Sequence, residues 1–493
     1  MTVASQLALL SATKSGIKAA IEAKGVTVGT VAFSEYPAKV AAIGSAPYVR
    51  PTDWLALPVI GATEQKFCGL FAVFAHGSNY VAFTALGNYT VDWGDGTVTN
   101  YASGVKAEHL YLYAGLPAGS VSSRGYKQAV VTLTPQAGAS LTYLNFNQLH
   151  SALSTSSKAG TPWLDMSISG PSLSALLMCS DSPVTGKPLL EKLTIGATSV
   201  ASYASMLVSC VRLREVSIGA NSALVSTNSM FQDCNALESA PLFDTSNVTD
   251  MAWTFYNCRN LKTVPLYDTA KVVNMSYMFR SCSLLSEVPT LNTSQVVNMS
   301  YMFQGCSVLK TVPLMDTSKV TTLLGTFADC FSLTTIPLLN TANVTTFSTT
   351  FRACASLVSV PLLSWAKVTN ADGAFTLCNA LEALPDFVSP STSNLNGFLT
   401  GFLQGLQELP AIDFLSTSIP ISNTAVPSLG RSRLKNVKIT HSYAYCSMQA
   451  AALEEVYTNL ATVTGQTITV TGNPGAAASN KSIATAKGWT VIP

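Results

Sequence analysis

The sequence predicts a mixed α+β protein of several domains: a short helical module, a β-sandwich, and a solenoid of 24-residue coils with a C-terminal cap. Two observations predict this organisation. Apolar residues first follow a helical period and then fall into short β-rich runs. From residue 210 onward, a 24-residue pattern repeats. A chain of 493 residues is also too long for a single hydrophobic core.

Residues 1–45 form the predicted helical module. Apolar residues recur at helical spacing over 4–23, Gly25 would end this helix, and a second short helix is expected over 33–43. The stretch resembles the N-terminal segment of phage tail and fibre-type proteins at Thr13-Lys14, Ile17-Lys18, Ala20-Ile21, Lys24-Gly25-Val26 and Tyr36. The resemblance implies a virion-attachment or oligomerisation module. The alternative is a small amphipathic cap for its own domain.

Residues 46–60 are predicted to be an extended, proline-containing linker, and residues 61–150 a β-sandwich. The expected strands cover 67–74, 79–83, 89–93, 110–113 and 129–133. The motif from Tyr89 to Thr97, followed by Glu108-His109-Leu-Tyr111, resembles PKD-type sandwiches. The insert 114–127 is longer than the usual loop of that family, so the strand limits near it are open.

Asp92 and Asp95 are the candidate cation ligands of the sandwich. Asp-Gly is also the strongest hairpin-turn signal, since Gly96 can take a positive φ, so a turn is the expected role. His109 is predicted to be a core histidine hydrogen-bonded near that turn, and not a metal ligand or general base. No cofactor and no metal site is predicted.

The solenoid is predicted over 151–440, with degenerate coils at both ends. Phe, Leu, Pro and Val columns follow the 24-residue period, and so do eight cysteines, Cys210, Cys234, Cys258, Cys282, Cys306, Cys330, Cys354 and Cys378. A period of this length with Leu-x-x-Val-x-Leu spacing is typical of a leucine-rich solenoid. The cysteines are expected to form a buried structural ladder, because neighbouring thiols in near-identical orientations are poorly placed for disulfides.

Each coil is expected to stack about 4.8 Å from the next through a short parallel strand. Leu261, Val264 and Leu266 are predicted to point inward from that strand, and Tyr267 outward. Pro265 has no N–H to donate, so the strand should have only about three residues and end at the proline.

The repeat resembles the BspA-like leucine-rich family, also seen in mycoplasma surface proteins. The matching residues are Asn247-Val-Thr-Asp-Met251, Met299-Ser-Tyr-Met-Phe303 with Cys306, and Asp316-Thr-Ser318. This resemblance implies the fold and a surface-interaction role. Residues 441–493 resemble the closing segment of phage-encoded members, and are predicted to form a cap with a helix near 450–460 and two strands joined by an Asn-Pro-Gly turn.

Two aromatic or apolar columns are the candidate binding surfaces: Trp253, Tyr277 and Tyr301, and Phe243, Tyr267 and Met315. Exposed, such stripes could bind glycan rings or a protein. The alternative is that they pack between coils.

Composition excludes several functions. A net charge of +2 without a basic cluster gives no general attraction to nucleic acid or anionic lipid. No apolar run reaches the roughly 18 residues of a membrane span. The first residues lack a basic region followed by an apolar core, so no signal peptide is expected.

No catalytic motif is present, and we expect no enzyme activity. The acid column reads Asp244, Asp268, Asn292, Asp316, Asn340, Ser364, an alternation that suits turn capping better than the paired carboxylates of a polysaccharide depolymerase.

The leading hypothesis is a bacteriophage virion structural protein, a tail-fibre or tail-associated receptor-binding protein. The N-terminal module would contact other virion proteins, the solenoid a host-surface glycan or protein, and the chain would be a homo-oligomer. Alternatives are a head, collar or baseplate fibre or decoration protein, and a BspA-like bacterial adhesin.

Overall fold

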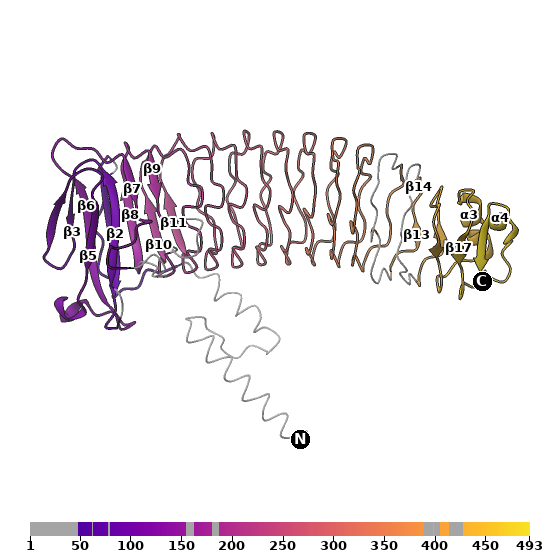
Figure 1. The fold of residues 1–493 in the computed structure, drawn as a ribbon, viewed down its shortest axis with the longest axis horizontal. Coiled ribbons are helices and arrows are strands. Elements are labelled where there is room, and N and C mark those ends of the chain that lie inside the picture. The colour runs from indigo at the N-terminus through magenta and orange to yellow at the C-terminus, as the bar shows by residue number, and fades with distance from the viewer. Residues whose placement is uncertain are drawn as a thin grey trace, which may run out of the picture. The chain divides into compact units, whose positions relative to one another are not determined.

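The computed structural model describes residues 48–61, 63–76, 79–153, 162–179, 187–388, 398, 405–413 and 427–493. The chain divides into two compact units, Met1–Thr52 and Asp53–Pro493. The predicted helical module at 1–45 lies outside the described residues. The second unit contains the sandwich and the solenoid (Figure 1).

The sandwich consists of two sheets. In the first, the strand order is β11 (Glu215–Ile218), β10 (Lys192–Ile195), β8 (Trp163–Ser169), β1 (Lys66–Val73), β6 (Lys127–Pro135), β3 (Tyr89–Asp92) and β4 (Val98–Tyr101). In the second, it is β5 (Lys106–Leu110), β2 (Tyr80–Leu86), β7 (Tyr143–Asn145) and β9 (Ala175–Leu177). Two short 3-10 helices, η2 (Tyr113–Gly115) and η3 (Ala118–Ser120), lie between β5 and β6.

Four of the five expected sandwich strands match observed ones over most of their length, and the fifth shares only Leu110 with β5. The strand expected at 110–113 is wrong, because β5 ends at Leu110 and η2 begins at Tyr113. Trp54, inside the expected linker, is buried against the sandwich, and its Nε1 donates to the Tyr126 hydroxyl at 2.9 Å.

Both sheets of the sandwich continue into the solenoid. Strand β8 pairs antiparallel with β1 on one side and parallel with β10 on the other, and β7 pairs parallel with β9. Figure 1 shows β7, β8, β9 and β10 next to one another. One hydrophobic cluster extends from Phe67 to Trp489. The sandwich therefore covers the apolar edge of the first coil, which a terminal repeat would otherwise expose.

Regular coils are joined mostly by single parallel bridges and not by strands of three residues. One column of bridges links Ser202, Ser226, Asp250, Asn274, Asn298, Thr322, Thr346 and Asn370 in series. On the side of the prolines, Ser239 bridges Thr263 and Ser359 bridges Ala383. Inside, the Phe rings at 231, 255, 279, 303, 327, 351 and 375 stack with centroids 5.3–5.8 Å apart. Backbone hydrogen bonds also join neighbouring coils at several positions, for example from the N–H groups of Ser229, Phe231 and Asp233 to the carbonyls of Ala252, Thr254 and Tyr256. Core packing and these backbone hydrogen bonds together hold the coils to one another.

Each regular coil turns through two residues with left-handed backbone, four positions apart. The first column contains Ser205, Ser229, Trp253, Tyr277, Tyr301, Gly325, Thr349 and Gly373. The second contains Ser209, Asp233, Asn257, Ser281, Gly305, Asp329, Ala353 and Leu377. A positive φ cannot continue an α-helix of L-residues. Because of these left-handed residues, each coil consists of turns and bridges and not of an α-helix.

The direction of two side chains differs from the prediction. Leu261 and Val264 are buried as expected, but Leu266 is 64% exposed and Tyr267 is buried. Side chains alternate between the two faces only where the ladder of hydrogen bonds between strands continues. This ladder ends at Pro265, because proline has no N–H to donate to the neighbouring coil. Beyond the proline the backbone turns Tyr267 inward, where its hydroxyl donates to the Pro241 carbonyl at 2.7 Å.

The last coils contain short parallel strands. These are β12 (Phe387–Val388), β13 (Glu408–Leu409), β14 (Ile412–Asp413), β15 (Arg431–Ser432), β16 (His441–Ser442), β17 (Gln466–Thr469) and β18 (Trp489–Ile492). The expected helix near 450–460 is confirmed as α3 (Ala450–Asn459), and α4 (Ser482–Thr485) comes after it. Strands β16, β17 and β18 are parallel neighbours, so β17 and β18 extend the stack and do not form a hairpin.

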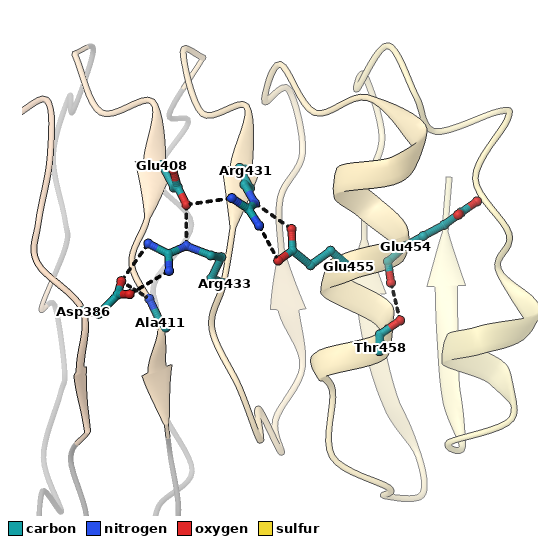
Figure 2. A network of polar contacts seen from close by, with 8 residues as sticks. All are labelled: Asp386, Glu408, Ala411, Arg431, Arg433, Glu454, Glu455 and Thr458. Atoms are coloured by element: carbon teal, nitrogen blue, oxygen red, sulfur yellow. Dashed lines mark hydrogen bonds and ion pairs between the residues drawn. The ribbon is translucent and has the colours of Figure 1, made fainter.

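A chain of ion pairs links these less regular coils (Figure 2). Arg433 contacts Asp386 at 2.7 Å and also Glu408, and Arg431 reaches Glu408 at 3.4 Å and holds Glu455 on α3 with two bonds of 2.7 and 2.9 Å. Hydrogen bonds from Arg433 lower the pKa of the Asp386 carboxyl, and Arg431 does the same for Glu455.

The prediction of a mixed α+β fold is wrong. In the part of the chain that the structure describes, α3 and α4 are the only α-helices, and the protein is mostly β, with a β-solenoid. The apolar positions of the coils recur with the coil length and not with a helical turn, so they build a stack of turns. None of the described helices is long and apolar enough to cross a membrane.

Candidate binding surfaces on the solenoid

A stripe of leucines lies on the outside of the solenoid. It consists of Leu242, Leu266, Leu314, Leu338 and Leu362, each 64–67% exposed and each following the column proline. Thr290 interrupts the column, and Asp386 takes the next position after Leu362. A single exposed leucine is ordinary, but an aligned series forms the kind of apolar patch that marks an interaction site.

Three members of the stripe, Leu314, Leu338 and Leu362, line a groove of about 950 Å³. Its other apolar lining residues include the buried side chains of Met315, Leu339, Leu363 and Trp365. Asp316, Asn340, Ser364 and Asp386 supply polar groups, and no Lys, Arg or His is among the lining residues. Covering one exposed leucine is worth roughly 1.5–3 kcal/mol, so three aligned leucines could contribute substantially to association.

The polar rim of the groove has a structural role. Asp316 Oδ1 accepts a hydrogen bond from the Ser318 backbone N–H at 2.9 Å, and Asn292 and Asn340 make the same turn in adjacent coils. The bonds from Ser318 lower the pKa of the Asp316 carboxyl. The acid column is therefore the predicted turn cap, with an amide on either side of Asp316.

The first aromatic column forms a continuous ladder. The Trp253 and Tyr277 rings stack at 4.0 Å and 12°, and the Tyr277 and Tyr301 centroids are 4.9 Å apart. The Arg280 guanidinium lies 5.4 Å and 5.5 Å from the Tyr277 and Tyr301 centroids. The three rings are partly exposed. Because they cover one another's faces, mainly their edges are open to a partner.

The three aromatic-ladder residues have positive φ, where a bulky side chain is an unusual and costly choice. Ser229 and Gly325 occupy the same position in the coils on either side. The stacking of the rings and the contact with Arg280 compensate for part of that backbone cost.

The structure places the second column inside. Phe243, Tyr267 and Met315 are 7%, 3% and 5% exposed, and the Phe243 and Tyr267 centroids are 5.2 Å apart. Met315 is the member of this column that reaches the groove. The six candidates thus separate into a partly exposed ladder and three core residues.

The cysteines from 210 to 378 are fully buried and free. From Cys234 onward, each thiol donates to the carbonyl 27 residues earlier, at 3.0–3.3 Å. Burial raises the pKa of these thiols, that of Cys330 to about 12.

The Asp-Gly turn of the sandwich is built as predicted. Asp92 Oδ1 accepts from the Gly94 N–H at 2.9 Å, and Asp95 Oδ1 from the Thr97 N–H at 3.0 Å. His109 is confirmed as the neighbour of this turn: its Nε2 lies 2.7 Å from Asp95 Oδ2, and its ring stacks on Trp93. Burial raises the pKa of Asp95, but the bonds from Thr97 and His109 outweigh it and the pKa is lowered.

Sequence reasoning missed the leucine stripe. Its signal was present, since leucine follows the proline in five coils. The Leu-x-x-Val-x-Leu pattern pointed the last leucine inward, and only the backbone path after the proline reveals the opposite direction.

The repeat and the coil together define a leucine-rich-repeat solenoid. Residues 275–392 match the family described as "BspA type Leucine rich repeat region (6 copies)", and residues 225–312 match "Mycoplasma protein of unknown function, DUF285". The middle of the chain therefore resembles a BspA-type leucine-rich repeat region. Neither match reaches the residues that resemble phage or PKD-type proteins.

No curated protein is significantly similar to this chain. One similar solved structure is described as "Crystal structure of TLR13-ssRNA13 complex", with 14% identity over 66% of this chain and a TM-score of 0.22. This chain spans about half the length of that one, 54%. A TM-score this low supports no inference about the present protein.

Proposed function

We propose that this chain is a non-catalytic adhesion protein whose solenoid binds a partner on a host surface. The observation that carries the proposal is the groove lined by Leu314, Leu338 and Leu362, each about two-thirds exposed. An aligned apolar surface of this kind is costly to leave in water, and covering it with a partner recovers that free energy.

The groove favours a protein partner over a glycan. Its exposed members are leucines, and its aromatic side chain, Trp365, is 4% exposed and so has little surface for stacking on a sugar ring. Apolar side chains of a protein segment would fit this lining best. The edges of the aromatic ladder offer a second, smaller contact.

We further propose that the chain acts on a bacteriophage virion, at the tail, and that residues 1–45 attach it to other virion proteins. Two resemblances support this proposal, that of residues 1–45 to tail and fibre-type proteins and that of 441–493 to phage-encoded closing segments. Electron microscopy of particles labelled with an antibody to the solenoid tests the location. Label on the tail supports the proposal, and label on the head or collar, or on no particle, contradicts it.

Binding is tested with purified chain immobilised on beads and a panel of bacterial strains. We expect at least one strain to adsorb, with adsorption reduced more than tenfold by the Leu338→Ser/Leu362→Ser double variant. Leu242→Ser is the matched control, because Leu242 belongs to the same stripe and is 67% exposed but lies outside the groove. Pretreating the cells with protease should abolish adsorption, and periodate should not.

Three outcomes would contradict the binding proposal. One is a panel in which no strain adsorbs. Another is equal adsorption of the groove variant and the wild-type chain. The third is sensitivity to periodate but not protease, which would assign the partner to glycan and remove the argument from the groove.

A further inference from the structure

The junction between the sandwich and the solenoid contains a thiol pair that differs from the rest of the cysteine ladder. Cys179 lies two residues beyond β9, and its sulfur is 3.8 Å from the sulfur of Cys210, the first member of the ladder. The cysteines from 234 onward instead donate to backbone carbonyls of the preceding coil. Cys179 precedes Cys210 by 31 residues, so Cys179 stands outside the 24-residue register that keeps the ladder thiols parallel.

We propose that Cys179 and Cys210 are a modification site, a dithiol that closes to a disulfide when the folded chain meets a small disulfide oxidant such as glutathione disulfide. A disulfide has sulfurs about 2.05 Å apart, so the two sulfurs must approach by roughly 1.8 Å. Rotation of the two side chains, with a small backbone shift, supplies a movement of this size.

The surroundings make Cys179 the attacking sulfur. Cys179 is 6% exposed, whereas Cys210 and the other ladder cysteines are 0% exposed, so a reagent meets Cys179 first. Hydrogen bonding from the Cys210 thiol, opposed by burial and aided by Lys187, lowers the pKa of Cys179. A thiolate is the nucleophile in disulfide exchange.

Lys187 is the positioning residue of this pair. Its side chain is 2% exposed, and its ammonium donates to the Phe146 carbonyl at 3.2 Å, directly after β7. Burial lowers the pKa of this amine, and both cysteines oppose that effect. A buried cation at this point stabilises the Cys179 thiolate against the cost of its own burial.

Oxidation of the pair proceeds by two thiol–disulfide exchanges. The Cys179 thiolate attacks one sulfur of glutathione disulfide, forming a mixed disulfide and releasing one glutathione thiolate. Cys210 then gives its proton to that thiolate and attacks the Cys179 sulfur, and the second glutathione departs as a thiolate that takes up the proton Cys179 had released to solvent. The protein loses two hydrogens, and one glutathione disulfide becomes two glutathione thiols.

The bond would join the residues directly after β9 to the first coil. Cross-linking of this kind restricts the unfolded chain and raises stability. A chain made in a reducing cell and released outside it would thereby be strengthened at the end of the stack that the sandwich covers. This inference does not depend on which partner the solenoid binds.

The test uses the reduced full-length chain incubated with glutathione disulfide at pH 7.5, followed by peptide mapping and thermal unfolding. We expect one internal disulfide, between Cys179 and Cys210, and a midpoint several degrees higher. Cys210→Ser should stop at a mixed disulfide on Cys179, heavier by one glutathione. Cys306→Ser, in the middle of the ladder, is the matched control and should oxidise like the wild-type chain.

Lys187→Met tests the positioning role, since the expected result is a shift of the pH–rate profile for oxidation to higher pH, with the same final disulfide. The proposal is overturned if folded chain retains both thiols after oxidation, or if the disulfide joins two cysteines of the 234–378 series. Mapping the wild-type chain gives this answer even if a variant fails to fold.

Discussion

The ring of Tyr301 lies over Gly325. A Cβ atom at residue 325 would come within 2.3 Å of Tyr301 Cε1, and Gly325 has a φ of +57°. The aromatic ladder therefore ends on a coil that has no side chain at the equivalent position. Glycine is needed here for space as well as for its backbone freedom.

Gly325→Ala is expected to lower the free energy of unfolding by about 2–3 kcal/mol, from left-handed backbone strain and a displaced Tyr301 ring. The matched control is Gly373→Ala. Gly373 has a φ of +60°, but a Cβ there would meet nothing closer than Thr376 Oγ1 at 3.3 Å, so only the backbone cost of about 1–2 kcal/mol applies. Urea unfolding measures the loss of unfolding free energy in both variants. Equal losses in the two variants would refute the contact with Tyr301.

Tyr277→Ser separates packing from binding in the aromatic ladder. Serine occupies this left-handed position in the coils with Ser205 and Ser229, so the backbone tolerates it. Loss of stacking on both sides should cost about 1–2 kcal/mol of stability. Because the rings cover one another's faces, we expect bacterial adsorption to fall less than in the Leu338→Ser/Leu362→Ser variant. A larger fall in Tyr277→Ser would make the ladder the principal contact surface.

The cysteine ladder predicts a steep loss of stability at alkaline pH. The thiols have an ordinary pKa of 9.0, and burial raises the pKa of Cys330 and Cys378 to about 12 in the folded chain. A raised pKa means that stability is fully present below pH 9 and is lost between pH 9 and 12, as unfolded thiols ionise and folded ones stay protonated. Each such thiol contributes a slope of about 1.4 kcal/mol per pH unit.

Urea midpoints measured from pH 7 to pH 10.5 check this slope. In the Cys330→Ala/Cys378→Ala variant, stability should fall less steeply with rising pH, because two of the thiols that cause the slope are absent. Its stability at pH 7 should be lower than that of the wild-type chain. A decline as steep as in the wild-type chain would mean that other groups cause the alkaline loss.

His441 predicts an acid-sensitive C-terminal end. It is 5% exposed in β16, its ring meets Tyr443 edge-on at 4.5 Å, and burial lowers its pKa from 6.5 to about 4. The neutral ring contributes stability that is present above pH 6.5 and is lost as the pH falls to 4, amounting to about 3 kcal/mol. His441→Leu should remove this part of the acid dependence.

Hydrogen exchange of the last coils at pH 7 and pH 5 measures the effect of His441 locally. His150→Gln, in the sandwich region, is the control and should leave the C-terminal exchange unchanged. If His441→Leu keeps the full acid sensitivity of these coils, the buried histidine is not its cause.

Much of the solenoid was predictable because neighbours in a repeat are copies of one another. Identical side chains at every twenty-fourth position must stack, so the buried columns of Phe and Cys follow from the sequence alone. The same logic fails beyond Pro265, because the ladder that enforces alternation stops there and the backbone path decides that Leu266 faces water and Tyr267 the core. For this reason the sequence alone did not predict the groove at Leu338.

The sequence by itself determined the coil length, the buried columns, the turn at Asp95 and the helix α3. The tertiary structure decided the rest: the sandwich shares its sheets with the first coil, and Cys179 meets Cys210. Equivalent residues of successive coils are always 24 positions apart in the sequence, so the repeat pattern predicts the contacts between them. Contacts across the junction have no such interval, since they arise only when two different folds are packed together.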